Sequence, residues 1–76
     1  RGLDMEMEFT LHAKEQIKER GIKVEEVINA IKNPDKINFE YGKYYAQKDI
    51  GRGIIMIVYK KDKYINIITI YWLKIK

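Results

Sequence analysis

Residues 9–22 read Phe-Thr-Leu-His-Ala-Lys-Glu-Gln-Ile-Lys-Glu-Arg-Gly-Ile, and the fold is decided by this stretch. Thr10 is a residue type that caps the first turn of a helix with its side-chain oxygen. Gly21 is the type that ends a helix in the left-handed conformation. We therefore predict a short helix from Phe9 to Gly21, and we expect the rest of the chain to position it over a sheet.

The chain has 76 residues, which is enough for a single domain, residues 1–76, with one helical layer on one sheet layer. Residues 1–4 precede two candidate start methionines, Met5 and Met7, and are expected to be a cloning remnant or a disordered end. No apolar run approaches the roughly 18 residues that cross a membrane, and no signal peptide opens the chain. We expect a soluble cytoplasmic protein without a membrane partner.

The composition argues against metal chemistry. The chain has no cysteine and one histidine, so neither a disulfide nor a thiolate zinc site can form, and no metal or cofactor is expected. The net charge is +4, which permits an anionic partner such as nucleic acid and equally fits a lysine-rich solvated surface. The bias toward lysine, glutamate and isoleucine suits a thermophile or an AT-rich genome.

A second helix is predicted from Val24 to Lys32, where apolar residues recur at the spacing of one buried stripe. Pro34 ends it, because proline disfavours helical geometry in the preceding residue. Everything that follows alternates between strand and turn, with turns at Gly42-Lys43, 49–53 and 61–63. The predicted strands are Met5–Phe9, at an edge, Ile37–Tyr41, Tyr44–Lys48, Ile54–Lys60 and Tyr64–Leu73. The expected fold is α+β, with a two-helix hairpin packed on one face of an antiparallel sheet of about four strands.

The last two strands are apolar on both faces. A symmetric hairpin would group Ile54, Met56 and Val58 with Ile68, Ile70 and Trp72 on one face. The other face would hold Ile55, Ile57 and Tyr59 with Ile65, Ile67, Thr69 and Tyr71. Two short helices cover one face only, so we expect the more polar face, with its tyrosines, to be exposed and covered by a second copy in a homodimer.

The remaining polar side chains are cations, one imidazole and several tyrosines, an inventory that suits phosphate recognition and metal-independent RNA cleavage. Such cleavage needs a base for the ribose 2′-OH, an acid for the leaving oxygen and positive charge on the phosphate. An arginine in a lysine-rich chain indicates a need for its planar fork. The candidate catalytic residues are His12, Arg20, Tyr59 and Tyr71, and the candidate nucleic-acid-binding residues are Lys48 and Arg52.

Each candidate also has a purely structural interpretation. His12 can be a packed or capping residue of the first helical turn, and Arg20 can be the cation that complements a helix C-terminus. Arg52 can be a solvated turn residue. Tyr59 and Tyr71 can be ordinary packing residues of a sheet.

Several short motifs carry a family resemblance. They are His12-Ala13, Arg20-Gly21-Ile22, Glu25-Glu26-Val27, Asn33-Pro34-Asp35, Gly51-Arg52, Val58-Tyr59 and Ile68-Thr69-Ile70-Tyr71. In this order, from Phe9 to Tyr71, the chain resembles the prokaryotic family named domain of unknown function 4258, whose layout is similar to RelE, ParE and BrnT-like toxins. One departure is Gln16, where a basic residue is common in the family.

The resemblance implies a toxin with a partner antitoxin, either a RelE-type endoribonuclease acting on RNA or a ParE-type inhibitor of a protein target. The alternative is a non-catalytic homodimeric module that binds protein or nucleic acid through an exposed sheet face. A nuclease should gather His12, Arg20 and either Lys48 or Arg52 in one cleft. A binding module should scatter these residues and leave an apolar face open.

Overall fold

The computed structural model describes residues 6–76, so the predicted features of residues 1–5 lie outside the described residues. The elements follow the predicted order of one strand, two helices and four strands. They are β1 (Met7–Phe9), α1 (Leu11–Arg20), α2 (Val24–Lys32), β2 (Lys36–Glu40), β3 (Lys43–Asp49), β4 (Gly53–Lys61) and β5 (Ile65–Ile75).

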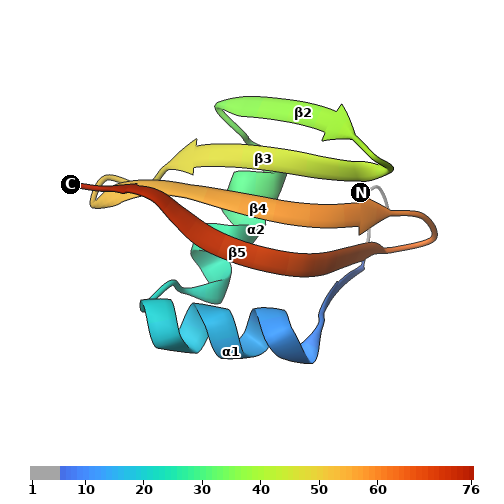
Figure 1. Cartoon of the computed structure of the whole chain (residues 1–76), viewed down its shortest axis with the longest axis horizontal. Helices are drawn as coiled ribbons and strands as arrows, with labels where there is room; N and C mark the ends of the chain where they lie inside the picture. The colour runs from blue at the N-terminus through green and yellow to red at the C-terminus, as the bar shows by residue number, and fades with distance from the viewer. Residues whose placement is uncertain (1–5) are drawn as a thin grey trace.

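The strands form one five-stranded sheet in the order β1-β5-β4-β3-β2 (Figure 1). The α+β class is confirmed, but the sheet is mixed and has one strand more than the expected antiparallel four. The difference is β1, which pairs parallel to the start of β5 with Met7 opposite Ile65. A parallel pair needs a crossover connection, and the two helices and the β2–β4 meander together provide it.

The two caps of α1 are those that the sequence predicts, although the helix begins at Leu11 and Phe9 belongs to β1. The Thr10 hydroxyl oxygen accepts a hydrogen bond from the Ala13 N–H at 3.0 Å. Gly21 adopts a left-handed φ of 66°, and its N–H bonds to the carbonyls of Ile17 and Lys18. Helix α1 therefore begins and ends for local reasons that need no tertiary contact.

Helix α1 then runs alongside β5 and covers the edge of that strand where β1 has ended (Figure 1). The Thr10 hydroxyl donates to the carbonyl of Ile68 at 3.2 Å. At the other end, the Trp72 indole N–H donates to the carbonyl of Arg20 at 3.1 Å. Ten helical residues rise about 15 Å and five strand residues about 17 Å, so the two elements stay in register along their common length.

The buried Gln16 is the central contact between α1 and β5. Its side-chain oxygen accepts hydrogen bonds from the Thr69 hydroxyl at 2.6 Å and from the Ile70 N–H at 2.8 Å. The Ile70 N–H belongs to the outer edge of β5 and would otherwise be buried without a partner. Gln16 therefore takes the place of a neighbouring strand at this point of the sheet edge.

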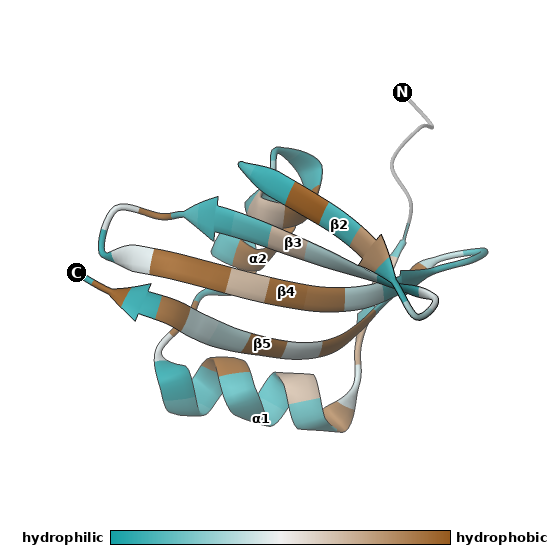
Figure 2. Ribbon diagram, turned by 45° about the horizontal axis from the view of Figure 1, so that its top comes forward, coloured by the Kyte–Doolittle hydropathy of each residue, from teal (hydrophilic) through white to brown (hydrophobic). Residues whose placement is uncertain are grey.

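Helix α2 lies behind β3 and β4, on the opposite side of the sheet from the viewer of Figure 1. Its buried residues Val27, Ala30 and Ile31 face the sheet. Figure 2 shows that the hydrophobic part of the ribbon is concentrated in β4 and β5, the central strands. The core between helices and sheet contains Ala13, Ile22, Val27, Ala30, Ile31, Ala46, Ile55, Ile57, Tyr59, Ile65, Ile67 and Ile70.

The turn between β2 and β3 consists of Tyr41 and Gly42, one residue earlier than predicted. Both have positive φ, 54° and 74°, as the favoured two-residue hairpin turn requires. The prediction at Gly42-Lys43 was wrong because glycine supplies only one of the two positive φ values. Tyr41 supplies the other and is fully outside the sheet, with 88% of its surface exposed.

The predicted division into two faces is right for β4 and for Ile65 and Ile67. It was wrong for the later residues of β5, because the hairpin is not symmetric. The register shifts twice, and the second shift leaves Ile68 as an extra residue between the pairs Val58–Thr69 and Tyr59–Ile67. An extra residue moves every later side chain of its strand to the opposite face. As a result, Tyr71 pairs with Met56 and lies on the face that the helices leave uncovered.

The two faces can now be defined. The helix face carries the buried residues Ile55, Ile57 and Tyr59 of β4. The opposite face, which we call the open face, carries Met56 and Val58 of β4 together with the residues paired to them. The expectation that Tyr59 would lie on the exposed face is therefore wrong, whereas Thr69 and Tyr71 do lie on the face that the helices leave uncovered.

Replacing Gln16 by leucine should lower the free energy of unfolding by about 1–3 kcal/mol, because the Ile70 N–H would be left buried without an acceptor. Chemical denaturation followed by circular dichroism measures this change. Gln47→Leu is the matched control, since Gln47 is half-buried on the open face of β3. Equal effects of the two substitutions would show that the Gln16 hydrogen bonds do not stabilise the fold.

Candidate functional site

Arg52 lies in the turn between β3 and β4 and joins that turn to the link between the two helices. One guanidinium nitrogen, Nη2, donates to the carbonyl of Gly21 at 2.6 Å and to the Glu26 carboxylate at 2.7 Å. The guanidinium also lies over the Trp72 ring, 5.6 Å from its centroid. The planar fork of Arg52 is thus used within the chain, as an anchor between three elements.

The turn around Arg52 admits no larger residue at Gly53. A Cβ atom at that position would lie 2.5 Å from the Lys74 carbonyl oxygen and 2.5 Å from the Trp72 ring. The absence of a side chain therefore allows Trp72 to reach Arg52 on one side and the Arg20 carbonyl on the other. The Arg-Gly sequence at 52–53 is explained by packing.

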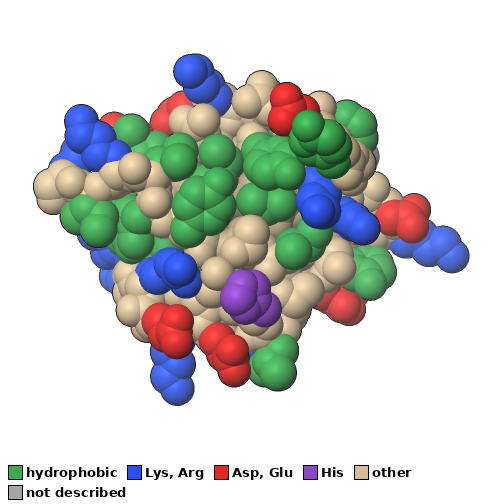
Figure 3. Space-filling model, viewed as in Figure 1, with side chains coloured by type: hydrophobic (Ala, Val, Ile, Leu, Met, Phe, Trp, Pro, Cys, Tyr) green, Lys and Arg blue, Asp and Glu red, His purple; other side chains and the backbone are tan. Residues whose placement is uncertain are grey.

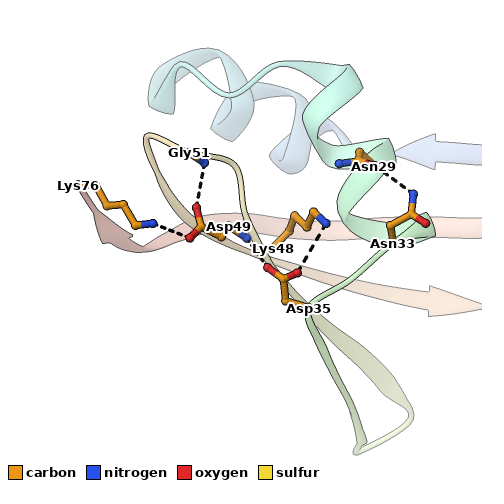
Figure 4. A network of polar contacts seen from close by, with 7 residues as sticks. All are labelled: Asn29, Asn33, Asp35, Lys48, Asp49, Gly51 and Lys76. Atoms are coloured by element: carbon orange, nitrogen blue, oxygen red, sulfur yellow. Dashed lines mark hydrogen bonds and ion pairs between the residues drawn. The ribbon is translucent and has the colours of Figure 1, made fainter.

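Lys48 belongs to a separate polar network at the end of β3 (Figure 4). Its ammonium lies 3.6 Å from the Asp35 carboxylate, which also accepts a hydrogen bond from the Asp49 N–H at 2.8 Å. Asp49 in turn accepts from Lys76 and from the Gly51 N–H. The Lys76 hydrogen bond, followed by that of Gly51, lowers the pKa of Asp49 below its ordinary value of 3.8.

Tyr59 is a core residue of the helix face, with 4% of its surface exposed. Its ring stacks on that of Tyr44 with centroids 5.2 Å apart, and Tyr44 in turn contacts Phe39 at 4.7 Å. Burial, and after it the neighbouring Tyr44, raises the pKa of Tyr59 above its ordinary value of 10.0. A buried phenol that holds its proton this firmly is poorly suited to donate it to a substrate at the surface.

Two of the candidate catalytic residues, His12 and Tyr71, lie on or beside the open face. His12 is exposed and precedes Gln16 by one helical turn, and Gln16 contacts Thr69 on β5. Figure 3 shows the one histidine of the chain, in purple, on the side of the molecule seen in Figure 1, below a field of hydrophobic side chains. His12 therefore lies at the margin of the open face, on which Tyr71 is half-buried.

The predicted site residues do not gather in one cleft. Arg20 lies eight residues beyond His12, which is about 12 Å along the helix axis. Arg52 is near Arg20 at that far end, and Lys48 is held by Asp35 on the side of α2. A nuclease was expected to gather these residues and a binding module to scatter them, so the observed arrangement is the one expected of a binding module.

The open face has an apolar centre and a polar rim. Met56 and Val58 form the centre, with 8% and 5% of their surface exposed, although no helix of the described chain lies over them. The neighbouring strands bring further side chains to the same face. Across β2, β3, β4 and β5 the rows are Lys36–Gln47–Met56–Tyr71 and Asn38–Tyr45–Val58–Thr69, with Glu40–Lys43, Lys60–Asn66 and Asp49–Ile54–Lys74 outside them.

Two tyrosines therefore flank the apolar centre diagonally, Tyr45 on β3 and Tyr71 on β5. They are separated by two strand spacings, about 10 Å, and are offset by about 7 Å along the strands. Lysines at positions 36, 43, 60 and 74 surround them. The face also carries three carboxylates, which are Glu40, Asp49, already paired with Lys76, and Glu8, which lies opposite Asn66 across β1 and β5. The face thus combines aromatic surfaces with a positive rim.

Sequence reasoning missed Gln16, Tyr45 and Met56. For Gln16 a signal existed, because the residue is one turn before Arg20 on the helix side that also holds Ala13. A single glutamine, however, does not predict a contact with the edge of a sheet. Tyr45 fell within the predicted strand Tyr44–Lys48. Its place beside Met56 follows from the register of β3 on β4, which the residue pattern alone did not determine.

The comparisons with known proteins identify the family. A family model described as a domain of unknown function, DUF4258, matches residues 9–72. The chain belongs to this family. The match runs from the last residue of β1 to Trp72 in β5 and so includes both helices and the open face of this DUF4258 domain. No curated protein and no solved structure matches the chain.

Two further observations concern the described residues. Neither α1 nor α2 is long and apolar enough to span a membrane. Within residues 6–76, no group of three or more His, Asp or Glu side chains is arranged to hold a metal ion.

Arg52→Ala should lower the free energy of unfolding by about 1–2 kcal/mol, since it removes the hydrogen bonds to Gly21 and Glu26 from a site that is partly screened by water. Thermal and chemical unfolding measure the change, with Lys63→Ala in the β4–β5 turn as control. Unchanged stability together with a loss of RNA binding would instead assign Arg52 to an interface.

Proposed function

We propose that this DUF4258 domain binds single-stranded RNA through the open face of its sheet. The observation that carries the proposal is the pair of tyrosines, Tyr45 and Tyr71, on either side of Met56 and Val58 on a face that neither helix covers. Unstacked bases bind to aromatic side chains presented by a sheet, and lysines around them bind the phosphates. The net charge of +4 supports an anionic partner.

The rim of the open face suits a flexible strand better than a duplex. Amide side chains at Asn38, Gln47 and Asn66 share the open face with the aromatic rings and the lysines. Such groups can hydrogen-bond to the exposed edges of unpaired bases. A duplex would hide those edges, and its phosphates alone would meet the rim.

A RelE-like endoribonuclease toxin is the second candidate, favoured by the position of His12 at the margin of the same face. The resemblance of the family layout to RelE-like toxins is the second support for this candidate. In this mechanism His12 would exchange the proton of the ribose 2′-OH, and Tyr71 would position or protonate the leaving oxygen. Lys48, Arg52 and Tyr59 would support the fold, and Arg20 lies about 12 Å from His12 along the helix axis and would not take part in the chemistry. An antitoxin partner and a cytoplasmic location belong to this second candidate.

Binding is tested by fluorescence anisotropy of a labelled single-stranded RNA of mixed sequence. Tyr45→Ala and Tyr71→Ala should each weaken binding by about 5- to 100-fold, because a stacked base contributes about 1–3 kcal/mol. Tyr41→Ala is the matched control, since Tyr41 is a highly exposed tyrosine in the β2–β3 turn and off the open face. Binding that is absent, or that falls equally in the control, would contradict the proposal.

Cleavage is tested with the same RNA, incubated with the protein in the presence of a chelator and analysed on a denaturing gel. If the second candidate is correct, the RNA is cut, and His12→Ala abolishes cutting while anisotropy and melting temperature stay unchanged. RNA that is bound and remains intact would contradict the nuclease candidate and support the binding module. Growth arrest on expression, with intact cellular RNA, would point to a protein target of the ParE kind.

A further inference from the structure

Strand β2 is the outer strand at the end of the sheet that β1 and α1 do not protect. All five of its residues, Lys-Ile-Asn-Phe-Glu at 36–40, are exposed. Ile37 and Phe39 are 47% and 61% exposed on the helix face, beyond the reach of α2. An exposed edge strand with apolar side chains is a ready template for pairing with another strand.

The direction of the free backbone groups follows from the contacts of β3. The Gln47 carbonyl accepts from the Asp35 N–H, and the Asp49 N–H donates to the Asp35 side chain. Gln47 therefore points its backbone groups toward β2, and successive residues of a strand alternate in direction. It follows that Lys36 and its even-numbered neighbours bond to β3, whereas Ile37 and Phe39 point their N–H and C=O groups away from the sheet.

The sequence of β2 complements itself when read in the opposite direction. Its ends are a cation, Lys36, and an anion, Glu40, and its apolar residues lie symmetrically about Asn38. In an antiparallel pair of two copies with Asn38 opposite Asn38, each Lys36 faces a Glu40 and each Ile37 faces a Phe39. Opposite charges and apolar residues that face one another across strands stabilise the pair.

The backbone favours the same register. Ile37 and Phe39 are the residues of β2 with outward groups, and in this register they face each other and exchange both of their hydrogen bonds. A shift by one step in either direction would bring Asp35 or Tyr41 into the pairing, and the Asp35 N–H is already bonded to Gln47 while Tyr41 has a positive φ.

We propose that β2 is a dimerisation edge, at which two copies of the chain pair antiparallel about Asn38 to form one continuous sheet. The two-fold axis is perpendicular to the sheet, as in other isologous contacts within one sheet. Phe39 then packs against the Ile37 of the other copy and extends the row Phe39–Tyr44–Tyr59 of the helix face. The two open faces join side by side, whether or not they bind RNA.

Sedimentation equilibrium of the full chain over a concentration series tests the dimer. The wild type should approach twice the chain mass of 9.1 kDa as concentration rises. Lys36→Glu should weaken dimerisation about tenfold, because it sets two carboxylates against each other at both ends of the pair. Glu40→Lys should do the same with two ammonium groups. Lys63→Glu, an equal charge change in the β4–β5 turn, should leave the wild-type dimer unchanged.

Mixing the two single variants provides the decisive measurement. A Lys36→Glu chain and a Glu40→Lys chain carry opposite charges at every facing position, so an equimolar mixture should regain nearly wild-type dimerisation. Regained dimerisation also shows that both variants are folded, although Glu40→Lys adds a like charge beside Lys43 of its own chain. A dimer whose dissociation constant is unchanged by all of these substitutions would overturn the proposal, because another surface would then hold it together.

Amide hydrogen exchange of the wild type gives an independent measurement. The N–H groups of Ile37 and Phe39 should become protected as concentration rises, whereas that of Asn38 should be protected at every concentration by its bond to β3. A wild-type chain that stays monomeric up to millimolar concentration, with Ile37 and Phe39 exchanging freely throughout, would overturn the proposal.

Discussion

The outer edge of β5 is the constraint on which the rest of the structure depends. Strand β1 pairs with β5 only as far as Ile67, and the backbone beyond that residue needs other partners. Helix α1 supplies them with the Thr10 hydroxyl and the Gln16 side-chain oxygen. Because the helix lies along this edge and packs its Ala13 side against the core, α2 is left to cover the middle of the sheet.

The polar residues of the helix side are largely committed to holding elements together. Arg52 ties the β3–β4 turn to the helix link, and Lys48 belongs to the network around Asp35. Residues of this kind are attractive as phosphate ligands in a sequence, since their types are right for that chemistry. In this chain, however, the donors of Arg52 and Lys48 bind carbonyl and carboxylate oxygens of neighbouring elements and so hold these elements together.

The open face and the β2 edge are the surfaces that the fold leaves available. The first has an apolar centre of Met56 and Val58 between two tyrosines, and the second carries the exposed Ile37 and Phe39. Both arise from the same limit, because two short helices cannot cover five strands. Met56 and Val58 are 8% and 5% exposed, so the centre of the open face presents little apolar surface to water.

The sequence by itself determined the elements, since helix caps, the Pro34 stop and strand patterns act through neighbours in the chain. Helix α2 has its predicted bounds, and α1 is capped by Thr10 and Gly21 as predicted. Only the tertiary structure decided which face of β4 is covered, that β1 pairs parallel, and what Gln16 and Arg52 do. The pairing of β1 with β5 and the hydrogen bonds of Gln16 and Arg52 join residues more than 25 positions apart. A pattern of neighbouring residues does not contain this information.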